Sequence, residues 1–163
     1  MKHRKLTLGM LMTAAALIPV FASATTGTDD SAGAEAVRHY LAIQSALAHD
    51  SLDGVSGHAA AFGALAEAAA PTDHNGTAIA AAANRLARSQ DLGEARRCFG
   101  DLSLLLLEDE ALIPADGLKV AYCPMAEKHW LQAADAIENP YYGSQMFRCG
   151  VFVERPESAG PPE

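Results

Sequence analysis

The spacing of the apolar residues changes at segment 114–117, where Pro114 and Gly117 interrupt the chain, and this change divides the sequence into two parts. Before the segment, apolar side chains recur every three or four residues, which is the spacing of one face of an α-helix. After it, residues 118–122 follow the alternation of a β-strand. The sequence therefore predicts a mainly α fold, an up-down bundle of three to four helices with a small C-terminal β-hairpin unit.

The bundle is predicted to contain four helical stretches, at residues 34–48, 54–70, 77–89 and 92–113. Asp53 and Asp91 are expected to cap the second and fourth stretches, and Pro71 ends the second. The third and fourth stretches could also form one long helix. Short connections favour antiparallel neighbours, and the many alanines let such helices approach closely.

The β unit is predicted to contain strands at 118–122 and 146–154, with a further short strand at 130–132 and a turn at Asn139-Pro140. Trp130, Tyr141 and Tyr142 are expected to pack this unit against the helices.

Residues 1–24 carry the pattern of a secretory signal peptide: Lys2, Arg4 and Lys5, an uncharged and mostly apolar run, and then Ala22-Ser23-Ala24. The run is shorter than the roughly 20 residues that a membrane span needs. We therefore expect cleavage after Ala24, a soluble periplasmic protein and no stable membrane insertion. The domain organisation predicted for the rest is a flexible leader at 25–33, the bundle at 34–113, the β unit at 114–154 in the same domain, and a disordered tail at 155–163.

The chain is acidic, with 20 acidic and 12 basic residues and a net charge of −8. Three basic residues and no acidic ones lie in the signal peptide, so the exported part carries a net charge of −11. A surface of this charge repels nucleic acid and anionic lipid. The charge therefore favours a cation as a partner and argues against nucleic acid.

The residues with the softest ligand atoms gather in the predicted β unit. Cys123 and Met125 follow its first strand, and Met146 and Cys149 open its second. Thiolates and thioethers are the ligands that Cu(I) prefers. If the two strands pair, these four residues converge, and His129 adds an imidazole. The sequence therefore predicts a Cu(I) site.

Two alternatives to this copper site stay open. Zinc would lack a fourth strong ligand, because Cys123, Cys149 and His129 are only three and a thioether binds zinc poorly. In an oxidising compartment, the two cysteines could instead form a disulfide, which would contribute about 3–4 kcal/mol through the unfolded state. Reduction would convert such a bridge back into a pair of ligands.

The remaining titratable residues give no catalytic pattern, and no activity as an enzyme is expected. Cys98 lies near the apolar stripe of the fourth helical stretch and is predicted to be a buried core residue. Four further histidines are predicted to be solvated: His39, His49, His58 and His74.

The motif residues of the β unit also carry a resemblance to a known family. They are Tyr122-Cys123-Pro124-Met125-Ala126, Trp130-Leu131-Gln132, Asn139-Pro140-Tyr141-Tyr142-Gly143, Met146 and Cys149-Gly150. The sequence resembles a bacterial exported domain of unknown function that in some proteins is joined to periplasmic adaptors of heavy-metal efflux pumps. The resemblance implies copper or silver handling and a partner in metal efflux or elsewhere in the envelope.

These observations predict a periplasmic Cu(I)-binding protein for sequestration or delivery, with Cys123, Met125, Met146, Cys149 and His129 as ligands. The alternative is a non-enzymatic envelope interaction module stapled by a Cys123–Cys149 disulfide.

Overall fold

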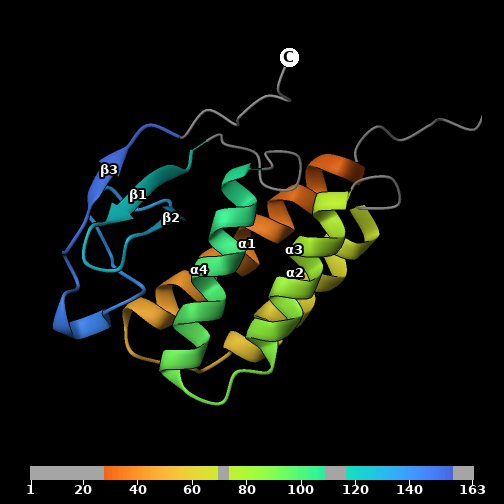
Figure 1. Cartoon of the computed structure of the whole chain (residues 1–163). Coiled ribbons are helices and arrows are strands. Elements are labelled where there is room, and N and C mark those ends of the chain that lie inside the picture. Colours follow the sequence, from red (N-terminus) through yellow and green to blue (C-terminus); the bar gives the residue numbers. More distant parts are fainter. Residues whose placement is uncertain (1–27, 70–73, 109–116, 156–163) are drawn as a thin grey trace, which may run out of the picture.

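The structure, a computed structural model, describes residues 28–69, 74–108 and 117–155. The predicted signal peptide, residues 25–27 of the leader and residues 156–163 of the tail lie outside this range. Within the described residues the helices are α1 (Thr28–Ala48), α2 (Val55–Ala69), α3 (His74–Ala87) and α4 (Leu92–Glu108). Figure 1 shows them side by side, with the C-terminal unit on one side of the bundle. None of the described helices is long and apolar enough to cross a membrane.

A three-stranded antiparallel sheet follows the bundle, in the order β2-β1-β3. Its strands are β1 (Lys119–Cys123), β2 (Lys128–Gln132) and β3 (Val151–Val153), and a 3₁₀ turn, η1 (Gly143–Gln145), lies before β3. β1 and β2 form a hairpin in which Ala121 pairs with Trp130, and β3 joins the other edge of β1. The mainly α fold with a small β unit is therefore confirmed.

The helix boundaries differ from the prediction mainly at the starts of α1 and α3. α1 begins at Thr28, so residues 28–33 of the predicted leader are helical. α3 begins three residues early, at His74. α3 and α4 are separate helices, because the Oδ1 atom of Asp91 accepts from the Glu94 N–H and starts α4 anew. Residues 109–113, predicted as helical, lie outside the described range.

The second predicted strand, 146–154, is wrong for most of its length. Only Val151–Val153 pairs with β1, and Cys149 donates its N–H to the carbonyl of Met146 in a turn. Gly150, with a φ of +148°, lies between this turn and β3. The apolar residues of the segment suggested a strand, but these local turns shorten it.

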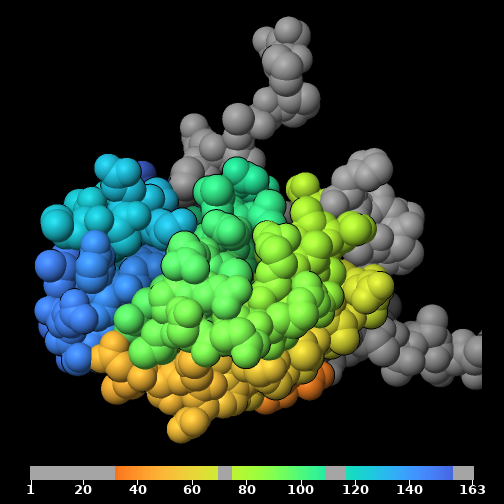
Figure 2. All heavy atoms as spheres, turned by 60° about the horizontal axis from the view of Figure 1, so that its bottom comes forward, coloured from red at the N-terminus to blue at the C-terminus, as the bar shows by residue number. Residues whose placement is uncertain are grey.

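One core joins the bundle to the sheet. The rings of Tyr40 and Phe99 lie 5.1 Å apart, Phe99 and Tyr141 lie 6.1 Å apart, and Tyr141 meets the Trp130 ring edge-on at 5.7 Å. The Tyr40 hydroxyl accepts from the Leu131 N–H and shares a hydrogen bond with Ser103. The β unit therefore shares its buried contacts with α1 and α4. Figure 2 shows it directly against α4.

Small residues allow the close helix packing that the alanine content predicts. A Cβ atom added at Gly63 of α2 would lie 3.4 Å from the Ala83 side chain of α3.

Candidate functional site

The two cysteines of the β unit form a pair of neighbouring thiols. Cys123 is the last residue of β1 and is fully buried, and Cys149 lies two residues before β3 and is half-buried. Their Sγ atoms lie 3.9 Å apart, within reach of a weak S–H···S hydrogen bond. A disulfide needs about 2.05 Å, so the structure holds the two residues as thiols. The predicted approach of Cys123 and Cys149 is therefore seen.

Removal from water raises the pKa of the Cys149 thiol, and the neighbouring Cys123 raises it further. A negative charge on Cys123 would repel a second one beside it, so Cys123 opposes ionisation of Cys149. Cys149 is consequently held in its protonated form around neutral pH, where a thiol is a poor nucleophile. This environment suits proton displacement by a metal better than attack on a substrate.

Asn139 fixes the position of Cys149. Its side chain is fully buried, and its Nδ2 donates to the Cys149 carbonyl at 2.7 Å. Its Oδ1 accepts from the N–H groups of Tyr141 and Tyr142 at 2.8 and 3.2 Å. One amide therefore shapes the Asn139-Pro140-Tyr141-Tyr142 turn and ties that turn to the cysteine.

The two tyrosines of this turn reach the β1–β2 hairpin. Tyr141 donates its hydroxyl to the carbonyl of His129, and Tyr142 donates its hydroxyl to the carbonyl of Met125 at 3.2 Å. These contacts hold the hairpin that carries Cys123 against the segment that carries Cys149. The predicted packing role of Tyr141 and Tyr142 is therefore joined by a role in positioning the backbone.

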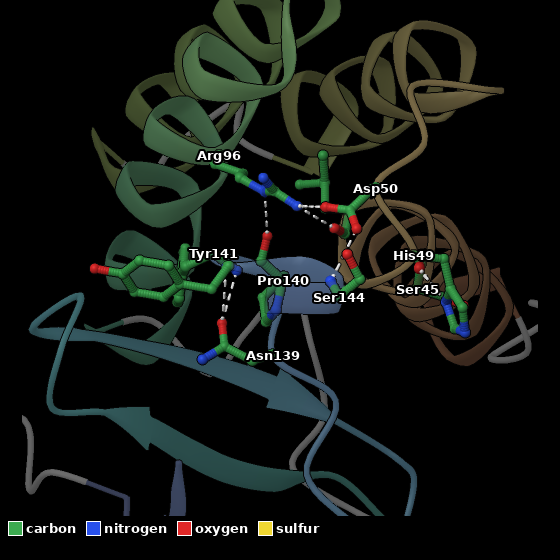
Figure 3. Close-up of polar contacts among 10 residues, drawn as sticks. Ser45, His49, Asp50, Arg96, Asn139, Pro140, Tyr141 and Ser144 are labelled. Carbon is green, nitrogen blue, oxygen red and sulfur yellow. Dashed lines mark hydrogen bonds and ion pairs between the residues drawn. The ribbon is translucent and has the colours of Figure 1, made fainter. Parts of the chain in front are cut away.

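An ion pair anchors the same turn to the helices (Figure 3). The Arg96 Nη2 donates to Asp50 Oδ1 at 2.5 Å and to the Leu47 carbonyl at 3.0 Å, and the Arg96 Nε donates to the Pro140 carbonyl at 3.0 Å. The Ser144 N–H donates to Asp50 Oδ2 at 2.8 Å. Hydrogen bonds from Ser144 and Arg96 hold the pKa of the Asp50 carboxyl well below its usual range.

Gly143 is required where this ion pair meets the turn. Its φ is +55°, and an added Cβ would collide with both Asp50 Oδ1 and Arg96 Nη2. The glycine thus serves the close approach of the turn to the loop after α1.

No known protein family, no curated protein and no solved structure matches this chain. The resemblance to the exported metal-associated domain stays a prediction, and the contacts of the site carry the functional argument.

The structure fixes the other predicted ligands less firmly than the two cysteines. Met125 lies in the β1–β2 connection and is 59% exposed, and Met146 follows η1 and is 38% exposed. His129 pairs with Tyr122 in the hairpin, one position away from the Cys123–Lys128 pair. Because side chains alternate along a strand, His129 lies on the opposite face of the sheet from Cys123.

His129 packs against the Tyr122 ring, with the ring centroids 4.6 Å apart, and burial lowers the pKa of its imidazole. The structure therefore does not bring His129 together with the thiol pair. Within the described ranges, no group of three or more His, Cys, Asp or Glu side chains is arranged to hold a metal ion.

Two predictions outside the β unit are wrong. Cys98 is half-buried at the edge of the core instead of fully buried. His39 is only 8% exposed, and its Nδ1 lies 2.8 Å from the Nδ1 of His58, which is itself half-buried. The prediction of solvation holds for His49, and the side chain of His74 lies outside the described set.

Sequence reasoning missed the Arg96–Asp50 pair and the His39–His58 pair. Asp50 lies just after α1, and Arg96 follows the buried Ala95 in α4. The position of Arg96 next to the apolar stripe of its helix was the one sequence feature that could have predicted a partly buried cation. The spacing of residues within one helix could not indicate the histidine contact, because His39 lies in α1 and His58 in α2.

Proposed function

We propose that this protein is an exported, non-enzymatic metal-binding protein that holds Cu(I) between the thiolates of Cys123 and Cys149. Residues 1–24 would direct it to the periplasm and be removed after Ala24. Its role there would be sequestration of the ion or delivery to a metal-efflux or other envelope protein. The observation that carries the proposal is the 3.9 Å separation of the two Sγ atoms in a fold that fixes both cysteines.

The sulfur separation suits one metal ion between two thiolates. Metal–sulfur bonds of about 2.3 Å, the length found for zinc thiolates, span at most about 4.6 Å between the two sulfurs. The separation of 3.9 Å falls below this limit, so little rearrangement would be needed. Cu(I) selects soft thiolate and thioether ligands, whereas structural zinc needs four strong ligands. The donor set therefore favours Cu(I).

The exposed thioethers of Met125 and Met146 are the proposed additional ligands. Neither side chain is packed into the core, so each can turn toward an ion at the thiol pair. Cys149 and Met146 belong to one turn, in which the Cys149 N–H donates to the Met146 carbonyl, so the two residues are neighbours along the backbone. The acidic surface would raise the local concentration of cations.

Titration with Cu(I) under anaerobic conditions, against a competing Cu(I) chelator, tests the proposal. We expect one ion per chain and at least a hundredfold loss of affinity in Cys123→Ser and in Cys149→Ser. We expect a smaller loss in Met125→Leu and Met146→Leu. Cys98→Ser is the matched control, because its thiol lies in α4, and it should bind as the unmodified protein does. Equal affinity of the protein and both β-unit cysteine variants would overturn the proposal.

The same thiol distance supports a second candidate, an envelope interaction module stapled by a Cys123–Cys149 disulfide. The two Sγ atoms are neighbours, so a modest shift would bring them to bonding distance. Alkylation of the protein during extraction from the periplasm, followed by mass spectrometry, separates the two candidates. Free thiols at both positions support the copper site, and a quantitative bridge that survives mild reductant supports the module.

A further inference from the structure

A pocket of about 290 Å³ lies between α4 and the C-terminal unit, and its lining is unusual for so acidic a protein. Three of its seven lining residues are cationic: Arg96, Arg97 and Lys128. The rest are the aromatic residues Tyr141 and Tyr142, with the small residues Gly93 and Ala126. We propose that this pocket binds a small organic anion, a single-ring apolar body that carries one carboxylate or phosphate group. This inference is independent of the metal proposal.

The charge balance in the pocket leaves two cations available. Arg96 is neutralised by Asp50 and donates to two carbonyls, so it contributes mainly to the wall. The Arg97 side chain is exposed and has no hydrogen-bond or ion-pair partner among the described residues. A guanidinium group presents paired donors that match the two oxygens of a carboxylate or phosphate.

Lys128 is held beside the pocket by its packing on α4. Its aliphatic stem crosses Gly100, where an added Cβ would lie 2.7 Å from the Lys128 Cδ. The nearest carboxylate, Asp101, is 3.9 Å from the Lys128 Nζ, too far for a hydrogen bond. The glycine therefore admits a lysine whose charge is only weakly paired, and a ligand anion could replace Asp101 as its partner.

The apolar part of the lining determines the rest of the ligand. Tyr141 and Tyr142 are aromatic and Ala126 is apolar, so this part of the lining suits apolar contact with a ligand ring. The volume lies just below the range of about 300–1,000 Å³ that holds small-molecule ligands. A single ring with one anionic group therefore fits better than a nucleotide or a peptide.

The fluorescence of Trp130 provides a readout for binding. It is the single tryptophan of the chain, and its ring lies edge-on to Tyr141 at 5.7 Å. The copper-free, reduced protein is titrated separately with benzoate, phenyl phosphate, inorganic phosphate and benzyl alcohol. We expect saturable changes with benzoate or phenyl phosphate, weakened by added salt. Whichever of the two binds more tightly shows whether the pocket prefers a carboxylate or a phosphate group. Inorganic phosphate, which lacks the ring, and benzyl alcohol, which lacks the charge, should bind at least tenfold more weakly.

Substitution tests the assigned cations. Arg97→Gln combined with Lys128→Gln should weaken the binding of the preferred anion at least tenfold. Arg88→Gln removes an exposed cation at the end of α3 and should leave the affinity unchanged. Circular dichroism confirms that the variants fold. The inference is overturned by the absence of a saturable response, by benzyl alcohol binding as well as benzoate, or by an unchanged affinity in the double variant. Because the titration contains no copper, its result tests anion binding separately from the metal proposal.

Discussion

The buried Asn139 side chain donates from Nδ2 to the Cys149 carbonyl at 2.7 Å, and this hydrogen bond places one thiol of the pair. The same amide uses Oδ1 to accept from Tyr141 and Tyr142, so both of its ends are engaged. The tyrosine hydroxyls in turn reach the hairpin of Cys123. The thiol separation therefore depends on a network of backbone contacts that extends well beyond the two cysteines.

Asn139→Ala is expected to destabilise the protein by about 3 kcal/mol, because a buried amide loses three hydrogen bonds and their partners stay buried or half-buried. It should also release Cys149, which would then react faster with a thiol reagent. Chemical denaturation and the rate of alkylation measure the two effects. Gln145→Ala removes an exposed amide in η1 and is the control. Equal alkylation rates in the unmodified protein and Asn139→Ala would contradict the positioning role.

Gly143→Ala is expected to destabilise the protein by more than 1 kcal/mol. Its φ of +55° is unfavourable for alanine, and the new methyl group would displace the Asp50–Arg96 pair. Gly57→Ala in α2 is the matched control, because nothing lies within 4 Å of the added Cβ. That change should stabilise the protein by about 0.5–1 kcal/mol. Thermal unfolding measures both, and equal shifts of the same sign would rule out the steric argument.

The residues that the sequence could predict are those with local patterns. The helices follow from apolar spacing and from a cap such as Asp91, which the structure confirms. The approach of Cys123 and Cys149 was also predicted. The prediction assumed a strand at 146–154, of which only Val151–Val153 is a strand in the structure. The Arg96–Asp50 contact joins residues 46 positions apart, and no periodic pattern encodes such a pairing. His39 and His58 escaped prediction for the same reason.

Loss of the Asp50 carboxylate should make the protein less sensitive to acid. Its folded pKa lies below that of the unfolded chain, near 3.9, so the carboxylate contributes stability above that pH. This contribution falls as the pH drops from about 4 toward the folded pKa. Asp50→Asn should unfold more easily at pH 7, and its stability should change less between pH 4 and 2. Denaturation at several pH values measures this slope.

Asp53→Asn is the control for this acid effect, since Asp53 is an exposed carboxylate in the same connection. Contrary to its predicted role as a helix cap, its side chain makes no hydrogen bond among the described residues. It should leave both the stability at pH 7 and the acid slope unchanged. Equal slopes for Asp50→Asn and the unmodified protein would show that the ion pair does not set the acid response.

The His39–His58 contact should make the bundle weaker as the pH falls below about 6.5. At 2.8 Å, one Nδ1 donates and the other accepts, so at least one ring is neutral. Burial, Arg38 and His58 lower the pKa of His39, which Glu35 partly offsets. A lowered folded pKa means that the unfolded chain binds the proton first, and stability is lost as the pH falls through this range.

The double variant His39→Gln with His58→Gln should unfold with a flatter pH dependence between 7 and 5. Denaturation in urea at each pH measures the free energy of unfolding. If the free energy of unfolding of the double variant depends on pH as steeply as that of the unmodified protein, the histidine pair does not cause the pH dependence. No other residue of the contact between α1 and α2 is changed in this variant.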